Sequence, residues 1–186
     1  MTNERFVVIG AGHAGGRAVE AMRNAGFEGE IILIGDEPHL PYERPPLSKE
    51  VLQSKSDYEF PFIRPREFYD EQNIELMLGV AANAINPAAK TVSLASGETV
   101  SYDKLLLTTG GRVRKLPIPG SELASTHYLR TLGDANAIEA ALGEGANLVV
   151  VGGGFIGLEV AASARQRGGK VTVLEIADRL MGRGVP

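Results

Sequence analysis

The sequence predicts an α/β protein in which one folding unit occurs twice: a buried strand, a glycine-rich turn, a helix, and a strand that ends in an acidic residue. Two observations carry the prediction. Continuous apolar runs at residues 5–9 and 147–151 each lead directly into a glycine cluster, as parallel strands covered on both faces do. Between the two units, short strand-like segments separated by turn residues predict an antiparallel β-meander.

The composition excludes several classes of function. The 186 residues carry a net charge of −4, so no nucleic-acid partner is expected, and no apolar run reaches the roughly 20 residues that span a bilayer. The start of the chain lacks the apolar core of a signal peptide, so we expect a cytoplasmic protein. The absence of cysteine excludes redox dithiols and cysteine-ligated metals within these residues, and the three histidines lack metal-ligand spacing.

The first unit is expected to contain a strand at residues 5–9, a helix that stops at Gly26, and a strand at residues 30–34. Three prolines follow, and they exclude a central strand or a helix before Leu47. A short helix is then expected over about residues 47–52. Residues 53–65 are expected to form an irregular loop.

The remaining elements follow from periodicity and turn residues. The expected helices lie at about residues 66–72, 132–142 and 157–166. The expected strands lie at residues 74–78, 80–85, 91–94, 98–101, 104–108, 147–151 and 170–174. Residues 112–120 contain two prolines and no periodicity, and are interpreted as a linker.

Each glycine cluster has the spacing of a dinucleotide-binding loop. The first glycine allows the tight turn, the second lets the backbone approach a pyrophosphate, and the third lets the helix pack close to the strand. The helix N-terminus offers unpaired N–H groups to the phosphates, and the acid after the second strand binds the adenosine ribose. These residues are Gly10, Gly12, Gly15 and Asp36 in the first unit and Gly152, Gly154, Gly157 and Glu175 in the second.

Two such units in one chain predict two bound dinucleotides. One flavin and one nicotinamide are chemically sensible, because hydride passes between their rings when the rings are held in contact. The Glu175 carboxylate would repel the 2′-phosphate of NADP, which favours NADH. Arg179 could reach such a phosphate, but we interpret it as a solvated surface arginine.

Six motifs along the chain carry a resemblance to known proteins. They are VVIGAGHAG (7–15), GDE (35–37), PYERPPLSK (41–49), LLLTTGG (105–111), YLRTLGDA (128–135) and VVVGGGFIGLE (149–159). The Pro-Pro-Leu-Ser-Lys segment and the Gly-Leu-Glu ending are the most specific of them. The motifs resemble those of the FAD- and NADH-dependent ferredoxin reductases that serve cytochromes P450 and aromatic-ring dioxygenases, within the pyridine nucleotide-disulfide oxidoreductase superfamily, and the similarity covers the whole chain.

The resemblance implies a glutathione-reductase-type fold. Residues 1–112 would form the N-terminal part of an FAD-binding domain, and residues 113–186 the first part of an NAD-binding domain. Members of this family are more than twice as long, so we expect a chain truncated at its C-terminus that does not turn over alone. The superfamily's disulfide and cysteine-peroxidase chemistry is excluded because the chain has no cysteine. No oligomeric state is predicted.

The resemblance also implies roles for individual residues. The residues expected at FAD are Gly10, Gly12, Ala14, Gly15, Asp36, Lys49, Ala82, Thr109, Gly110 and Arg130. Those expected at NAD(H) are Gly152, Gly154, Ile156, Gly157, Glu159 and Glu175. Lys49 and Glu159 are the candidate catalytic residues: Lys49 would stabilise the negative charge of the reduced flavin, and Glu159 would pair with Lys49 near the nicotinamide. The alternative interpretations are that Lys49 is a surface lysine and that Glu159 is a carboxylate favoured by the helix dipole.

The implied activity is electron transfer from NADH through FAD to a [2Fe–2S] ferredoxin that feeds an oxygenase or a cytochrome P450. Such ferredoxins are acidic, so a basic docking patch is expected, with solvated charge as the alternative for any one residue. The candidates are Arg64, Arg66, Arg112, Arg114 and Lys115. Two other functions stay open at this point: an NADH-binding flavoprotein of the apoptosis-inducing-factor kind with an interaction or signalling role, and an NADH oxidase.

Overall fold

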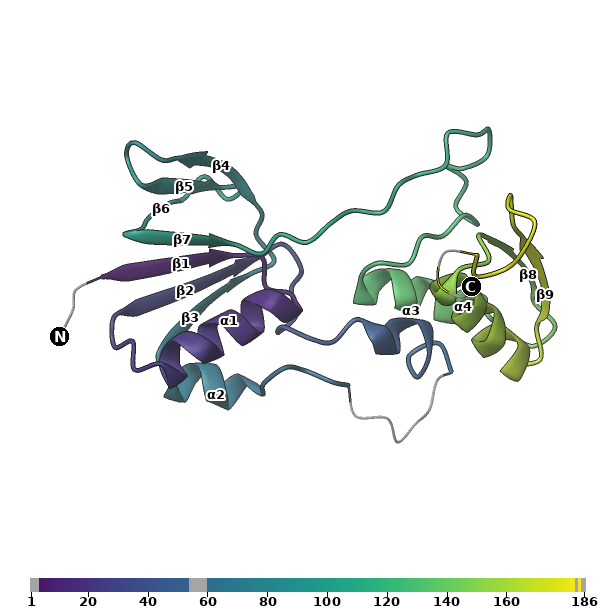
Figure 1. Cartoon of the computed structure of the whole chain (residues 1–186), viewed down its shortest axis with the longest axis horizontal. Helices are drawn as coiled ribbons and strands as arrows, with labels where there is room; N and C mark the ends of the chain where they lie inside the picture. Colours follow the sequence, from purple (N-terminus) through teal and green to yellow (C-terminus); the bar gives the residue numbers. More distant parts are fainter. Residues whose placement is uncertain (1–3, 54–59, 183, 185–186) are drawn as a thin grey trace. The chain divides into compact units, whose positions relative to one another are not determined.

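The computed structural model of the chain describes residues 4–53, 60–182 and 184. The chain forms two compact units (Figure 1). The first contains the residues up to Glu43 and Phe60–Gly111, and the second contains the described residues of 44–59 and 112–186. Residues 54–59 of the expected loop at 53–65 lie outside the described part. The segment that carries Lys49 therefore belongs to the second unit, although the sequence places it inside the first.

A parallel sheet of four strands forms the centre of the first unit, in the order β3-β2-β1-β7. The strands are β1 (Arg5–Ile9), β2 (Glu30–Gly35), β3 (Ile74–Leu78) and β7 (Lys104–Leu107). Val7 of β1 lies opposite Ile32 of β2 on one side and Leu105 of β7 on the other, and it is fully buried. The unbroken apolar run of β1 is explained by this central position, because both of its faces are covered.

Two different layers cover the faces of this sheet (Figure 1). Helices α1 (His13–Asn24) and α2 (Arg66–Glu71) pack on one face, where Val8 contacts the cluster that contains Val19 and Tyr69. The antiparallel meander of β4 (Ala82–Asn86), β5 (Thr91–Leu94) and β6 (Thr99–Ser101) packs on the other face. Successive residues of each strand point to opposite faces, so the sheet supplies both cores.

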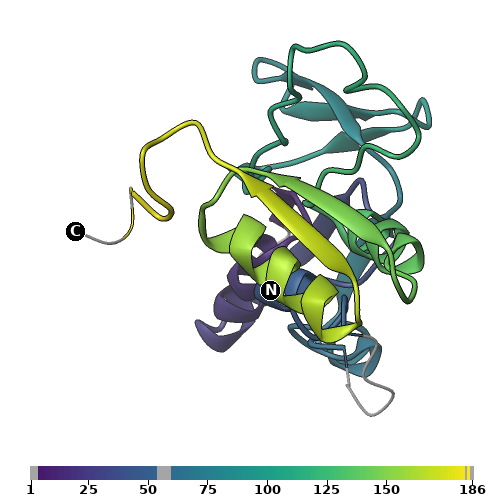
Figure 2. The same ribbon diagram turned by 90° about the vertical axis from the view of Figure 1, so that its right-hand side faces the viewer.

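In its described residues, the second unit contains a parallel strand pair, two α-helices and one short 3₁₀ helix. Strands β8 (Asn147–Val151) and β9 (Lys170–Leu174) pair in parallel, and α4 (Phe155–Gln166) lies along them (Figure 2). Helix α3 (Leu132–Ala141) and the 3₁₀ helix η1 (Pro45–Ser48) complete the unit, and η1 contacts both α3 and α4.

The expected helix over residues 47–52 is wrong in both type and bounds. The structure has η1 over Pro45–Ser48, and the following residues form turns. The two prolines occupy the first positions of η1, where a missing N–H costs nothing and a φ fixed near −65° suits a helix. The prolines therefore start the helix rather than delay it. Among the described residues, no helix has the length and apolar character needed to cross a membrane.

Candidate functional site

The first glycine turn joins β1 to α1, and two of its glycines are required by the fold itself. Gly10 has φ +111°, and a Cβ there would lie 2.3 Å from the carbonyl oxygen of Thr108. A Cβ on Gly15 would lie 1.9 Å from the carbonyl oxygen of Gly10, so the helix could not approach the strand as closely. These contacts match the turn and packing roles predicted for the first and third glycines.

The second turn, between β8 and α4, repeats this arrangement and adds an informative difference. Gly152 has φ +108°, and a Cβ on Gly157 would lie 2.1 Å from the carbonyl oxygen of Gly152. Gly154 has φ −82°, which any residue adopts, and a Cβ there would meet no atom within 4 Å. The fold does not need a glycine at this position. A glycine there leaves the backbone open to a ligand, which fits a dinucleotide pyrophosphate.

Both helices that follow these turns begin without an internal cap. Gly12 and Gly154 are the N-caps of α1 and α4, neither receives a side-chain cap, and neither first turn contains an acidic residue. Helix α3 behaves differently, because Thr131 and Asp134 form a complete capping box at its start. The N–H groups at the starts of α1 and α4 therefore have the chemistry of a phosphate site, as the glycine spacing predicts.

The two acids predicted at the ribose follow β2 and β9. Asp36 is exposed directly after β2, where the neighbouring Gly35 packs against Ala11 of the first turn. The Glu175 carboxylate accepts hydrogen bonds from the N–H of Gly153 at 2.7 Å and from the N–H of Ala177 at 2.9 Å. The second acid is thus tied to the glycine turn that it was predicted to serve.

Lys49 and Glu159 form the expected ion pair, with Nζ and Oε2 3.0 Å apart. The same Oε2 accepts a hydrogen bond from the hydroxyl of Ser48 at 2.6 Å. The Lys49 ammonium also donates to the carbonyl oxygen of Pro45 at 3.1 Å. One carboxylate on α4 therefore binds two consecutive residues at the end of η1.

These contacts change the acidity of Glu159. Its partial burial raises the carboxyl pKa, but the hydrogen bonds from Ser48 and Lys49, with the charge of Lys49, outweigh that effect and hold the pKa below its ordinary value. Glu159 is therefore a carboxylate at neutral pH, and Lys49 keeps a charged partner.

A cavity of about 300 Å³ in the second unit brings several predicted site residues together. Lys49, Arg130, Ile156 and Glu159 line it, along with Arg44, which donates a hydrogen bond to the carbonyl oxygen of Arg130. Phe155 and Ile156 each expose more than half of their surface, so the cavity combines apolar area with three cations and one carboxylate. That lining can hold a flat aromatic ring beside a charged group.

Other predicted cofactor residues lie at element boundaries in the first unit. Ala14 is in the first turn of α1, Ala82 opens β4, and Thr109 and Gly110 follow β7, with Gly110 at φ +64°. Their roles at a flavin stay predictions. Analysis of the sequence missed Ser48, which lies inside the Pro-Pro-Leu-Ser-Lys motif. Its position beside Lys49 was the only available indication of a role.

Two of the candidate docking cations are already paired. Arg64 forms an ion pair with Glu20, and Arg66 forms one with Asp70 at 3.1 Å. Arg112, Arg114 and Lys115 are exposed and form no ion pair with any residue of the described chain. Of the five candidates, these three remain available to an acidic partner.

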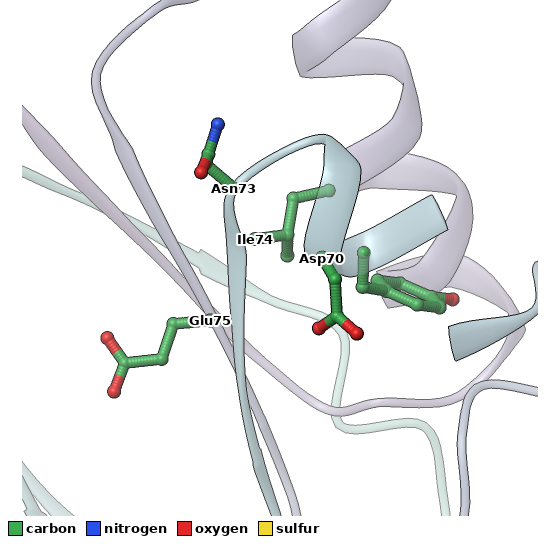
Figure 3. A pocket seen from close by; sticks show the side chains of 5 residues that line it. Asp70, Asn73, Ile74 and Glu75 are labelled. Carbon is green, nitrogen blue, oxygen red and sulfur yellow. The ribbon is translucent and has the colours of Figure 1, made fainter. Parts of the chain in front are cut away.

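A second hollow, of about 330 Å³, lies where α2 leads into β3 (Figure 3). The labelled polar side chains of Asp70, Asn73 and Glu75 point in different directions rather than toward one centre (Figure 3). Asp70 is paired with Arg66, and no group of three potential metal ligands occurs in the described residues. This hollow has the character of an ordinary surface depression.

Comparison with known proteins identifies the chain's relatives. The model of the pyridine nucleotide-disulphide oxidoreductase family matches residues 4–186. Rhodocoxin reductase of Rhodococcus erythropolis is 46% identical over 97% of this chain and 42% of its own length. The ferredoxin–NAD(+) reductase component of the anthranilate 1,2-dioxygenase system of Burkholderia cepacia is 46% identical over all of this chain and 46% of its own length.

The solved structures agree with these sequence matches. The crystal structure of the covalent putidaredoxin reductase–putidaredoxin complex matches with a TM-score of 0.94 and 40% identity, over all of this chain and 45% of that one. The ferredoxin reductase for the CYP199A2 system of Rhodopseudomonas palustris matches with a TM-score of 0.93 and 42% identity, over 99% of this chain and 45% of that one. The chain spans less than half the length of each of these relatives.

Proposed function

The chain belongs to the pyridine nucleotide-disulphide oxidoreductase family, and from that premise we propose that it carries the dinucleotide-binding loops of an FAD-dependent NADH:ferredoxin reductase. In the proposed reaction, electrons pass from NADH through FAD to a [2Fe–2S] ferredoxin that feeds an oxygenase or a cytochrome P450. The relatives named as ferredoxin reductases of such systems support this assignment. The 186 residues contain no cysteine, so they supply no redox disulfide of their own.

One observation carries the proposal. Two parallel strands each lead through a glycine turn into a helix whose N-terminus has no internal cap, and Gly154 is a glycine that the fold does not require. The first loop, with Gly10, Gly12 and Gly15, would hold FAD, and the second would hold NADH. A bound flavin would accept hydride from the nicotinamide and release electrons one at a time.

The chain's own residues have defined tasks in this proposal. Lys49 holds a positive charge at the wall of the cavity, where it stabilises negative charge on a neighbouring ring. Glu159 and the carbonyl oxygen of Pro45 hold the ammonium in place. The exposed faces of Phe155 and Ile156 give an aromatic ring an apolar surface to lie on.

The proposed nicotinamide cofactor is NADH rather than NADPH. One oxygen of Glu175 accepts the N–H of Gly153 in the loop and the other accepts the N–H of Ala177, which fixes the carboxylate where a 2′-phosphate would meet like charge. The guanidinium of Arg179 is exposed and directed at the carbonyl oxygen of Gly182, 3.4 Å away.

For the docking of an acidic ferredoxin we propose the exposed cations Arg112, Arg114 and Lys115. Three cations within four positions, in a chain of net charge −4, form a local positive patch. Such a patch raises the association rate with an acidic partner more than it raises affinity, and salt weakens the effect.

The experiment that tests the function is an anaerobic stopped-flow measurement on the full-length natural protein. Rapid loss of flavin absorbance on adding NADH, followed by rapid reoxidation only when a [2Fe–2S] ferredoxin is added, is the expected result. Slow reduction with a long-lived charge-transfer band would instead support the apoptosis-inducing-factor-like function. Fast reoxidation by oxygen alone would support an NADH oxidase.

A matched pair of glycine variants tests the NADH loop. Gly154→Ala places a methyl group where no protein atom lies, so the fold is retained while the pyrophosphate is pushed away. We expect NADH binding to weaken about tenfold or more, with flavin content unchanged. Gly143 is equally open and lies away from the loop, so Gly143→Ala is the control and should bind NADH normally. Equal NADH affinity in both variants would contradict the assignment.

A further inference from the structure

One face of α4 carries a row of polar residues that all bind the same segment. Glu159, Ser163 and Arg167 are spaced by four, so their side chains lie one above another along the end of α4 and its C-cap. Glu159 accepts hydrogen bonds from the side chains of Ser48 and Lys49, as described above. The Ser163 hydroxyl donates to the carbonyl oxygen of Ser48 at 2.9 Å, and Arg167 donates to the carbonyl oxygen of Leu52 at 2.9 Å.

The middle contact of this row is the most buried. Ser163 is 1% exposed and Ser48 is 4% exposed, and they are the two buried polar residues among the described parts of the chain. Alanine would fill the Ser163 position in a helix equally well, and a buried hydroxyl costs free energy unless it is hydrogen-bonded. The hydroxyl is therefore explained by its bond to Ser48.

This bond fixes the peptide group between Ser48 and Lys49. The carbonyl oxygen that Ser163 binds belongs to that peptide, so its plane sets the direction in which the Lys49 side chain leaves the backbone. Ser163 itself touches neither the ammonium of Lys49 nor the carboxylate of Glu159 by any hydrogen bond in the described structure. Any influence it has on that ion pair passes through the backbone.

We propose that Ser163 is a positioning residue that aligns Lys49 with Glu159 by holding the carbonyl oxygen of Ser48, and that Arg167 fixes the far end of the same segment at Leu52. The consequence for catalysis rests on the proposed function, because it requires that Lys49 act at a flavin. The alignment itself does not, since all of its contacts lie within the second unit.

The test measures the titration of Glu159 in the full-length natural protein, with glutamate carboxyl groups labelled with ¹³C. Glu159→Gln identifies the resonance. The charged groups around this carboxylate are Lys49 beside it, Arg44 and Arg130 across the cavity, and the Arg167–Glu139 pair further along the segment. In Ser163→Ala the donors to Glu159 lose their alignment, so its pKa should rise toward the ordinary carboxyl range.

Control variants separate an effect of Ser163 on the alignment of Lys49 with Glu159 from a general loss of protein stability. Ser121→Ala removes a hydroxyl of the same unit whose hydrogen bond, within the described residues, is to Glu122, and it should leave the Glu159 titration unchanged. Ser163→Cys keeps a weak donor and should give an intermediate pKa. If Ser163→Ala fails to fold, Arg167→Met carries the same test. A Ser163→Ala protein that melts earlier but titrates Glu159 like the wild type would overturn the proposal.

A kinetic measurement distinguishes this proposal from the proposed function. If both hold, Ser163→Ala should slow flavin reduction by NADH about tenfold, because small displacements of a catalytic group are costly. Lys49→Met serves as the reference. If Lys49→Met reduces its flavin at the wild-type rate, the role given to Lys49 is wrong, while the titration of Glu159 still decides whether Ser163 positions it.

Discussion

Gly157 lies against the backbone of Gly152 so closely that a Cβ on Gly157 would be 2.1 Å from the carbonyl oxygen of Gly152. Gly15 and Gly10 repeat this relationship in the first unit at 1.9 Å. The same backbone geometry thus occurs in two units that share no hydrogen-bonded sheet. In both, the closeness of helix to strand places the helix N-terminus directly at the turn.

The first prediction separates glycines that fold the chain from glycines that leave space for a ligand. Gly157→Ala should lose about 3 kcal/mol or more of unfolding free energy, because a backbone oxygen cannot yield as a flexible side chain can. Gly154→Ala should lose less than about 1 kcal/mol, since its methyl group meets no protein atom. Urea unfolding of both variants measures the difference. Equal losses would contradict this division of roles.

The second prediction concerns the buried hydroxyl of Tyr69. The side chain is fully buried, and its hydroxyl makes no hydrogen bond with the described residues. Tyr69→Phe should therefore keep or slightly raise the unfolding free energy, because an unsatisfied polar group is removed and the ring is kept. Tyr69→Ala is the packing control and should lose about 3–5 kcal/mol. A loss in Tyr69→Phe comparable to that in Tyr69→Ala would show an unrecognised partner for the hydroxyl.

The same residue predicts a difference at high pH. Burial, together with the nearby Glu20 carboxylate, raises the pKa of Tyr69 from 10.0 to about 12. The folded state therefore holds this proton more tightly than the unfolded state. That contribution is complete below pH 10 and is lost as the pH rises toward 12. The stability of the wild type relative to Tyr69→Phe should fall over this interval, and a constant difference would contradict it.

The third prediction concerns Arg23, whose guanidinium binds four backbone carbonyl groups. It donates to Phe27 at 2.6 Å, Gly29 at 2.8 Å, Gln72 at 2.8 Å and Asn73 at 2.9 Å. Arg23→Met should lose about 2 kcal/mol or more of unfolding free energy, because partly buried carbonyl groups lose their donors.

A surface arginine on the short helix α2 supplies the control for that measurement. Arg66→Met removes an exposed pair with Asp70 and should lose about 0.5 kcal/mol or less. Arg23→Lys should fall between the two, since one ammonium cannot reach four carbonyl groups in a planar fork. Chemical denaturation of the three variants ranks them, and a similar loss for Arg23→Met and Arg66→Met would refute the role of the four hydrogen bonds.

The fourth prediction concerns the contribution of Glu159 to the unfolding free energy at low pH. The pKa of Glu159 is held below its ordinary value in the folded protein, so its pairing stabilises the fold above the unfolded-state pKa of about 4.3. That stabilisation is lost as the pH falls through the folded pKa, where the carboxylate is protonated. The difference between wild type and Glu159→Gln should therefore shrink on acidification. A difference that grew as the pH fell would reverse the sign and contradict the pairing.

Elements bounded by clear local features were predicted well. The expected strands at residues 5–9, 74–78, 147–151 and 170–174 have these bounds in the structure. Each is a short, mainly apolar run that ends at glycine, an acid or charged residues, so local sequence suffices to define it. The turns at Gly10 and Gly152 could also be predicted, because a glycine cluster after an apolar run is a local pattern. The role of these turns at a dinucleotide stays a prediction.

The features that were missed depend on contacts between distant residues. The membership of residues 44–53 in the second unit follows from the contacts of η1 with α3 and α4. A serine before a lysine has no distinctive local pattern, so the role of Ser48 appears only when Glu159 and Ser163 are brought beside it. Local periodicity contains no information on such partners.

The hydrogen bond between Ser48 and Glu159 joins residues 111 positions apart. During synthesis on the ribosome, the lysine-bearing segment emerges long before the helix against which it will rest. In the sequence, this segment is an insertion between the two parts of the first unit. Until α4 has been synthesised, this segment lacks the helix that binds it, and chaperones and proteases can reach it. Dividing the gene after residue 111 would give a C-terminal half that lacks Lys49.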